Sequence, residues 1–254
     1  MKEKKVKHGP PALFNSMMQP HFCPGCHYGI ILHCFMEALE QTGVAGQSIL
    51  VPGIGCSMVS AHYIKGIEGL VALHGRAPAV ATGLKRALGK EKLIFTMQGD
   101  GDLSAIGMGE IIAAAGRFEK LTTLFLNNAN FGTTGGQMAP TSLLGQVTPT
   151  TPTGRKAEGD GFPIHMAELM ASFKGVVFSF RGAVHTHKHY NQTRKALVTA
   201  IEKQKADQGY SFVEILSACP PGLHLKPSAG LKLVAEKLIP EFPLGEFKNT
   251  DRPA

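Results

Sequence analysis

Short apolar runs alternate along this chain with longer segments of helical periodicity. Each run is bounded by glycine, proline or polar residues, which is typical of a buried strand; the runs are residues 48–51, 70–73, 93–97, 122–126, 176–180 and 212–216. The helical patterns lie before, between and after these runs, at residues 29–41, 78–88, 106–118, 166–173, 190–205 and 231–238. Such alternation predicts an α/β fold whose mostly parallel sheet is covered by helices on both faces.

Length and composition predict a single domain. With 254 residues, of which 43% are hydrophobic, the chain can bury a full core. We expect one domain over residues 1–254, with tails at 1–15 and at about 240–254. No apolar stretch is long enough to span a bilayer, and the basic residues from Met1 to Lys7 precede no hydrophobic segment. We therefore expect a cytoplasmic protein without a membrane segment or a secretory signal.

The chain is basic, with a net charge of +7 and a pI near 9.2. Its lysines are dispersed, and no repeat of basic and aromatic residues is present, which argues against nucleic-acid binding. A positive surface also suits anionic substrates, phosphate cofactors and acidic electron carriers. We expect binding partners of these kinds.

Glycines and oxygen-bearing side chains follow two of the expected strands. Residues 93–97 lead into Gly99-Asp100-Gly101-Asp102, and residues 122–126 lead into Asn127-Asn128-Ala129-Asn130. Glycines let the backbone approach a phosphate, and a divalent cation such as Mg²⁺ reconciles a nearby carboxylate with that anion. Because ligands bind beyond the carboxyl ends of parallel strands, we expect these loops to share a rim with the turn that contains His74 and Arg76. There His74 and Arg76 would hold a diphosphate or a substrate carboxylate.

Four of the five cysteines lie in loops rich in glycine or proline. Cys23 and Cys26 frame one loop, Cys56 follows the first expected strand, and Cys219 follows the last. In a reducing compartment this placement favours metal ligation over disulfides. Four thiolates suit tetrahedral Zn²⁺ and a 4Fe–4S cluster equally well by ligand type. The fifth cysteine, Cys34, lies inside an apolar helical pattern and is expected in the core.

Other polar segments give weaker signals. Residues 132–159 are rich in glycine, threonine and proline without periodicity, so we expect a cofactor lid or a partner contact there. His185, His187 and His189 alternate, but we expect them to be solvated rather than bound to a metal. His62 and Lys65 follow Cys56 and would lie within reach of a substrate.

These motifs together resemble a known family. Gly99-Asp100-Gly101 followed by Asn127-Asn128 resembles the thiamine diphosphate fingerprint. The stretches from Gly99 to Gly107 and from Phe131 to Gln137 look like the beta, thiamine-binding subunit of 2-oxoacid:ferredoxin oxidoreductases. The resemblance runs from about His21 to Pro221 and implies the thiamine diphosphate-binding fold.

The resemblance also implies roles for individual residues. It implies Mg²⁺ ligation by Asp100, the Asn128 side chain and the Asn130 carbonyl. It implies a 4Fe–4S cluster on Cys23, Cys26, Cys56 and Cys219. The residues implied to line the thiamine diphosphate are Gly99, Gly101, Asp102, Thr134, Gly135 and Gly136. Family members carry a similar His-Gly-Arg turn, and His74-Gly75-Arg76-Ala77 looks more like the groups acting on 2-oxoglutarate or branched-chain 2-oxo acids than like the pyruvate group.

The activity implied by the resemblance is the CoA-dependent oxidative decarboxylation of a 2-oxo acid to an acyl-CoA and CO₂, with electrons passed to ferredoxin. Thiamine enzymes need a carboxylate against the aminopyrimidine ring, and no glutamate here stands in a recognisable motif for that role. The resemblance implies that an alpha-like subunit supplies this carboxylate and completes the thiamine site. A ferredoxin-like subunit or an external ferredoxin would accept the electrons. Two alternatives remain open. A non-redox thiamine-dependent decarboxylase or synthase would need no cysteine quartet, and a zinc-stabilised binding module would leave the acidic and asparagine-rich strand ends unexplained.

Overall fold

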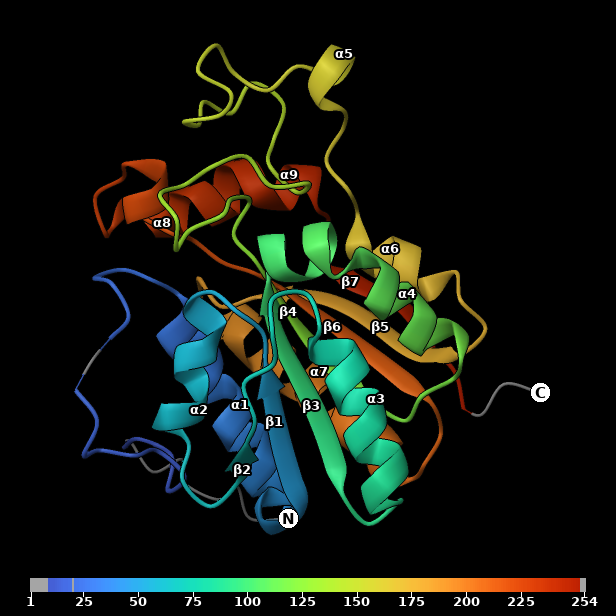
Figure 1. Ribbon diagram of the computed structural model, residues 1–254. Coiled ribbons are helices and arrows are strands. Elements are labelled where there is room, and N and C mark those ends of the chain that lie inside the picture. Colours follow the sequence, from blue (N-terminus) through green and yellow to red (C-terminus); the bar gives the residue numbers. More distant parts are fainter. Residues whose placement is uncertain (1–8, 20, 252–254) are drawn as a thin grey trace.

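A computed structural model of the chain describes residues 9–19 and 21–251. Within them the strands form one seven-stranded sheet in the order β2-β1-β3-β4-β6-β5-β7 (Figure 1). The strands are β1 (Ser48–Pro52), β2 (Glu68–Gly69), β3 (Leu93–Gly99), β4 (Thr122–Asn127), β5 (Val176–Ala183), β6 (Tyr210–Leu216) and β7 (Gly245–Asn249). All neighbouring strands pair in parallel except β7, which is antiparallel to β5. The predicted mostly parallel sheet is confirmed.

Helices cover both faces of the sheet, as predicted. α1 (Tyr28–Thr42) and α7 (His187–Lys205) pack on one face, whereas α3 (Ala77–Leu88), α4 (Met108–Gly116) and α6 (Met166–Ala171) pack on the other. Their apolar faces meet the two sides of the central strands, which are buried along nearly their whole length. Cys34 lies fully buried in the α1 core, as its helical pattern predicts.

Shorter helical elements complete the described part of the chain. They are η1 (Ala45–Gln47), η2 (Cys56–Val59), α2 (Ser60–Tyr63), η3 (Gly101–Ile106), α5 (Ala157–Asp160), η4 (Pro221–Leu223), α8 (Ala229–Leu233), η5 (Val234–Leu238) and α9 (Ile239–Glu241). α8, η5 and α9 enlarge the helix predicted at 231–238 and form a third apolar cluster beside residues at or just after the ends of β4, β5 and β6. No helix in the described ranges is long and apolar enough to cross a bilayer.

The strand predicted at residues 70–73 is wrong. β2 ends at Gly69, and Leu70, Val71 and Leu73 are largely exposed. The chain still follows β1, because the N–H groups of Leu70 and Ala72 donate to carbonyls of that strand. A segment at the sheet edge has a neighbour on one side only, so its apolar side chains are left uncovered.

The tail predicted at about 240–254 is also wrong over much of its length, because residues 245–249 form β7. Phe247 of this strand packs against the core cluster under α3, α4 and α6. At the other end, residues 1–8 of the predicted tail lie outside the described residues, but Phe14 forms a bridge with Ile64 and packs on the α1 core. Each segment has only a few apolar residues that pack on the core. The hydrophobic pattern of the sequence therefore does not reveal that these segments pair with other segments.

Candidate functional site

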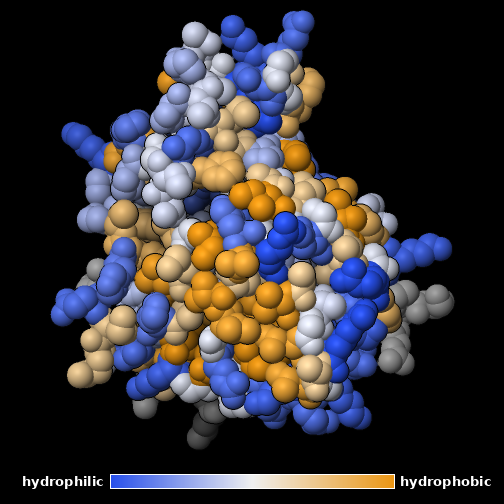
Figure 2. All heavy atoms as spheres, viewed as in Figure 1, coloured by the Kyte–Doolittle hydropathy of each residue, from blue (hydrophilic) through white to orange (hydrophobic). Residues whose placement is uncertain are grey.

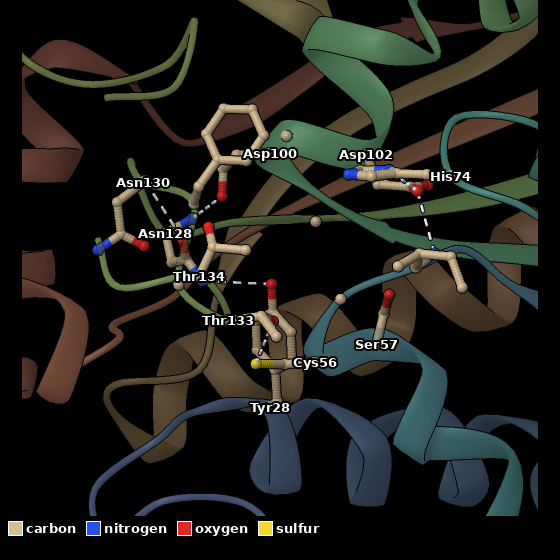
Figure 3. Close-up of a pocket in the computed structure, with 16 residues that line it drawn as sticks. Tyr28, Cys56, Ser57, His74, Asp100, Asp102, Asn128, Asn130, Thr133 and Thr134 are labelled. Atoms are coloured by element: carbon tan, nitrogen blue, oxygen red, sulfur yellow. Dashed lines mark hydrogen bonds and ion pairs between the residues drawn. The ribbon is translucent and has the colours of Figure 1, made fainter. Parts of the chain in front are cut away.

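The carboxyl ends of β1, β3 and β4 open into one pocket of about 120 Å³. Figure 3 shows Asp100, Asn128 and Asn130 on one side of this pocket, Asp102 with His74 on the other, and Cys56 beside Thr133 below them. The three loops expected on one rim therefore all reach this pocket. The loops after β3 and β4 contribute several residues each, and the turn before α3 contributes His74 alone.

Three oxygen-bearing residues converge at the ends of β3 and β4. One terminal atom of the Asn128 amide lies 2.9 Å from Asp100 Oδ2, 3.0 Å from the Asn130 carbonyl oxygen and 2.9 Å from Asn130 Oδ1, while the other faces the Tyr28 hydroxyl at 3.2 Å. The amide nitrogen at the first position would donate to these oxygens. The amide oxygen at that position would bring four oxygens together, an arrangement that a hard cation such as Mg²⁺ stabilises. The residues predicted as Mg²⁺ ligands thus form a donor set that fits this ion.

Asp100 is 1% exposed, and its carboxylate is held from two sides. Oδ2 accepts from the Asn128 N–H at 2.8 Å, and Oδ1 accepts from the Thr141 hydroxyl. Burial raises the pKa of Asp100 to about 7, although these two hydrogen bonds act in the opposite direction. A buried carboxylate of this kind gains from a nearby cation, because the cation offsets the cost of its charge.

The two asparagines at the end of β4 face in different directions. Asn127 donates from Nδ2 to Glu214 Oε1 at 2.7 Å, inside the sheet, and Glu214 in turn pairs with the buried Arg181. Asn128 faces the pocket. The first residue of the pair therefore anchors the loop, and the second contributes its amide to the pocket lining.

Asp102 lies 2% exposed at the other side of the pocket, where its carboxylate joins three segments. Oδ1 accepts from His74 Nδ1 at 2.6 Å, from Gly75 N at 2.9 Å and from Ile54 N at 3.0 Å, and Oδ2 accepts from Gln98 Nε2. The carboxylate predicted to line a diphosphate is therefore turned toward the loops that follow β1 and β2. Its evident work in this structure is to hold those loops and orient the imidazole.

The glycines of the β3 loop are set by close neighbours. A Cβ on Gly101 would lie 1.9 Å from the Phe131 ring, and one on Gly99 would lie 2.9 Å from the Tyr28 hydroxyl. The helical turn η3 begins at Gly101, earlier than the predicted start at residue 106, so its first N–H groups lie at the strand end. Unpaired N–H groups at such a start suit an anion.

The four loop cysteines gather near this pocket. Cys56 lines it, with Sγ 3.0 Å from Thr133 Oγ1. Cys219 follows β6, and a Cβ on Gly132 or Gly222 would lie 2.9 or 3.0 Å from its sulfur, so both glycines keep that sulfur clear. Cys23 and Cys26 lie in a turn just before α1, with Cys26 N donating to Cys23 O at 3.0 Å.

The sulfurs of these cysteines lie within electrostatic reach of one another. The pKa of Cys26 is raised to about 12, mainly by burial and to a smaller extent by the charges of Cys219, Cys56 and Cys23. Nevertheless, no group of three or more His, Cys, Asp or Glu side chains in residues 9–19 and 21–251 has the arrangement that holds one metal ion. The four thiols share one region without forming the compact ligand set of a single ion.

Not every predicted site residue lines the pocket. Thr134 does, with its hydroxyl donating to Gln137 Oε1 at 2.6 Å, but Gly135 and Gly136 do not. Gly136 packs against the Cys219 loop, where a Cβ would lie 2.0 Å from Gly222 O. Arg76 is half exposed outside the pocket, and its guanidinium pairs with Glu110 of α4.

The remaining histidines and Lys65 lie elsewhere. His187 and His189 are in the first turn of α7, and the His185 and His189 rings stack with centroids 4.6 Å apart. The His62 carbonyl and the Lys65 N–H bond to the segment around Leu13 and Asn15, and neither residue lines the pocket.

Sequence reasoning missed Tyr28, Phe131 and Thr133, which all line the pocket. Phe131 and Thr133 lie within three residues of Asn130. This closeness to the asparagine loop is the sequence signal that could have placed them in the pocket. Tyr28 is far from that loop in sequence, and only the packing of α1 brings its hydroxyl to Asn128.

Comparisons with known proteins agree with this geometry. Residues 53–215 match the model of the thiamine pyrophosphate enzyme, C-terminal TPP binding domain, thiamine pyrophosphate being another name for thiamine diphosphate. The ketoisovalerate oxidoreductase subunit VorA of Methanothermobacter thermautotrophicus is 40% identical over 229 residues, which cover 90% of this chain and 48% of that protein. The chain thus spans about half the length of VorA.

Two further relatives cover most of both chains. The 2-oxoglutarate synthase subunit KorB of Methanothermobacter marburgensis is 34% identical over 256 aligned residues, covering 92% of this chain and 85% of KorB. A solved 2-oxoglutarate:ferredoxin oxidoreductase from Magnetococcus marinus, with 2-oxoglutarate, coenzyme A and succinyl-CoA bound, superposes with a TM-score of 0.78 at 25% identity, over 98% of this chain and 88% of that one. Together with the domain match, these similarities show that the chain belongs to the family of thiamine diphosphate-binding subunits of 2-oxoacid:ferredoxin oxidoreductases.

Proposed function

We propose that this chain is a single domain that binds thiamine diphosphate, Mg²⁺ and a 4Fe–4S cluster, within a cytoplasmic enzyme that converts a 2-oxo acid, CoA and oxidised ferredoxin into an acyl-CoA, CO₂ and reduced ferredoxin. One observation carries the proposal. The same pocket is lined by the oxygen donors Asp100, Asn128 and Asn130 and by the thiol of Cys56. An organic cofactor bound by the oxygens would lie beside a centre bound by the sulfur, as electron transfer between them requires.

The oxygen donors support a cation–diphosphate site. Asp100 carries the charge, and the Asn128 side chain and the Asn130 carbonyl supply neutral oxygens. The Asn128 amide atom that faces this site lies 2.9 Å from Asp100 Oδ2 and 3.0 Å from the Asn130 carbonyl oxygen. Gly99 and Gly101 would let the diphosphate approach, at the start of η3, with Thr134 at the pocket wall and Gly135 and Gly136 shaping the loop behind it. When bound there, thiamine diphosphate supplies the chemistry that decarboxylates 2-oxo acids.

His74 is the better candidate of the two proposed catalytic residues. It lines the pocket, and because Nδ1 is bonded to Asp102, its Nε2 is the nitrogen that is left for a substrate or diphosphate oxygen. Arg76 would have to break its ion pair with Glu110 to reach the same place. We therefore assign Arg76 an electrostatic role at most, offsetting the negative charge of the cofactor and substrate from outside the pocket.

The family resemblance implies that the sulfur donors hold a cluster rather than one ion. Thiolates around four irons stand farther apart than thiolates around one Zn²⁺ ion. The four thiols lie within reach of one another's charge, and the described part of the chain contains no His, Cys, Asp and Glu group arranged to hold a single ion. We therefore propose the 4Fe–4S cluster on Cys23, Cys26, Cys56 and Cys219, rather than structural zinc.

Exposed apolar residues beside the pocket support a partner subunit. Leu70, Val71 and Leu73 are 46%, 41% and 78% exposed, directly before His74. The hydrophobic surface at the lower centre of Figure 2 lies over the region where Figure 1 shows the segment between β2 and α3. We propose that an alpha-like subunit covers this surface and completes the thiamine site. A ferredoxin-like subunit or external ferredoxin would accept the electrons.

The substrate is proposed as a 2-oxo acid of the branched-chain or 2-oxoglutarate type. The names of the relatives VorA and KorB point to ketoisovalerate and 2-oxoglutarate respectively. Reduction of ferredoxin by the purified complex, measured with each acid in the presence of CoA, decides between them.

The test of the cofactor set is anaerobic purification of the chain with its native partners, followed by analysis of iron, sulfide, zinc and thiamine. About four irons and four sulfides per chain, together with thiamine diphosphate, would support the proposal. Cys56→Ser should lower the iron content and leave thiamine bound, whereas the matched control Cys34→Ser, in the α1 core, should leave iron unchanged. Zinc without sulfide would refute the electron-transfer role, and thiamine without iron would favour a non-redox decarboxylase.

A further inference from the structure

The segment between β4 and α6 reaches back into the proposed cation site. Thr141 is fully buried, and its hydroxyl donates to Asp100 Oδ1. The other oxygen of that carboxylate, Oδ2, faces Asn128. Thr141 therefore fixes the rotation of the carboxylate and decides which of its oxygens is presented to a cation.

The same segment holds the backbone between the two asparagine ligands. Ala129 lies between Asn128 and Asn130 and has a φ of 59°, in the left-handed region that alanine rarely adopts. Its carbonyl accepts from Ser142 Oγ at 2.6 Å and from Gln146 Nε2 at 2.8 Å. Two donors from one segment thus hold the unusual conformation that turns both asparagines toward Asp100.

Arg155 ties this segment together from outside the pocket. Its side chain is buried, 4% of the residue being exposed, and its guanidinium donates to backbone carbonyls on two sides. On one side are the carbonyls of residues 139, 140 and 142, and on the other are those of residues 160, 161 and 162. The Arg155 backbone also pairs with Gly145 and Gln146, at 2.8 and 3.0 Å. Every donor of Arg155 is thus spent on the loop that carries Thr141, Ser142 and Gln146.

The hydrogen bonds of Arg155 stabilise an irregular segment and also bear on the pocket. Most of residues 138–165 lack regular structure, and α5 lies far from the sheet (Figure 1). Hydrogen bonds within this segment therefore stabilise it in place of an apolar core. Burial of this guanidinium is costly: it lowers the pKa of Arg155, although the charges of Asp160 and Glu241 act in the opposite direction. On the pocket side it bonds backbone carbonyls of residues 139, 140, 142 and 146. Side chains of this same stretch, those of Thr141, Ser142 and Gln146, contact Asp100 and Ala129.

We propose that Arg155 is a positioning residue for the cation site, acting through Thr141, Ser142 and Gln146 on Asp100 and Ala129. The inference rests on the cation site of the proposed function. Residues that orient metal ligands in this way change metal affinity by about 10- to 100-fold when they are replaced. The effect should be larger for a small ion that demands fixed geometry than for a larger and more tolerant one, so Mg²⁺ should be weakened more than Ca²⁺.

The experiment measures cation binding to the full chain, purified with its partner subunits and supplied with thiamine diphosphate. Mn²⁺ serves as the spectroscopic probe, and Mg²⁺ and Ca²⁺ compete with it. Thr141→Val, which keeps the shape and removes the hydroxyl, and Arg155→Met should each weaken Mn²⁺ binding by about tenfold or more and shift selectivity toward Ca²⁺. Thr141→Ser should bind nearly as well as the unmodified chain. The matched control is Thr82→Val, which removes a buried hydroxyl of α3 bonded only to Pro78 O.

The outcomes separate the two proposals. Unchanged Mn²⁺ affinity and selectivity in Thr141→Val would overturn the positioning role, even if thermal stability falls as it does in Thr82→Val. If Arg155→Met fails to fold, Thr141→Val and Thr141→Ser still decide the matter. Absence of Mn²⁺ binding in the unmodified chain would overturn the cation site itself and, with it, the proposed function.

Discussion

Removing the Asp102 carboxylate should cost much of the stability of this chain. In Asp102→Ala the N–H groups of Ile54 and Gly75 and the amide of Gln98 lose their acceptor in a part-buried setting. Each buried donor left without a partner costs about 1–3 kcal/mol, so we expect the three to cost about 3–9 kcal/mol together. That is a large share of the roughly 5–15 kcal/mol that stabilises a typical native protein.

The isosteric change Asp102→Asn should be far milder. The asparagine oxygen can still accept from Ile54 and Gly75, and its NH₂ group can face the Gln98 amide after that amide rotates. Gln98 Oε1 has no hydrogen-bond partner among the described residues, so the rotation costs little and the change should cost about 1 kcal/mol.

Urea unfolding followed by circular dichroism compares the two variants with the unmodified chain, provided that the slopes of the transitions agree. The midpoint should fall steeply for Asp102→Ala and slightly for Asp102→Asn. Equal midpoints for the two variants would show that the four hydrogen bonds to this carboxylate do not hold the loops, and the reasoning would be refuted.

Three further predictions follow from other contacts. Gly53→Ala would place a Cβ 1.9 Å from Asp102 Oδ2, so it should destabilise the otherwise unmodified chain but cost little stability in the Asp102→Ala background. A double-mutant cycle in urea measures this coupling, and additive losses of stability would contradict the clash. For Glu168, burial raises the pKa, but the hydrogen bond and charge of Arg181 outweigh it, so the pKa lies below its ordinary 4.5. The stability that this pair provides should be present above about pH 4.5 and lost as the pH falls through the lowered pKa, and Glu168→Gln should flatten that loss in acid unfolding; an unchanged acid limb would count against it. Leu73→Lys, at a side chain 78% exposed, should weaken co-purification of partner subunits without lowering the unfolding midpoint, whereas Leu88→Lys, 45% exposed at the end of α3, should leave co-purification intact. Equal effects of both changes would remove the proposed surface.

Much of the sheet was predictable, because its central strands are buried on both faces. Residues 93–97 and 122–126 are covered by α1 and α7 on one side and by α3, α4 and α6 on the other, so their apolar runs are continuous. The edges did not follow from the same signal. Residues 70–73 are apolar but uncovered, and β7 is polar but paired, because an edge strand is set by one neighbour and not by two layers of helices.

The proposed cation site was predictable in its residues but not in its support. Asp100, Asn128 and Asn130 meet because parallel strands end on one side of the sheet, which is a rule that a sequence can invoke. The turning of Asp102 toward Gln98 and Ile54, and of Arg76 toward Glu110, depends on distances that only packing decides. Arg155 gave no signal at all, because its partners are backbone carbonyls, which every residue carries.

The antiparallel strand β7 has a consequence for how this chain behaves when it is shortened. β7 occupies the outer edge of β5, an almost wholly buried strand, and Lys248 fastens it by donating to Phe173 O at 2.6 Å. Without residues 245–249, the free backbone groups of β5 would form an open apolar edge, which is a template for adding strands from other molecules. A version truncated after residue 244 should therefore aggregate, as light scattering would record, although its pocket residues are untouched. By covering the edge of β5, β7 thus prevents this chain from associating with other copies of itself.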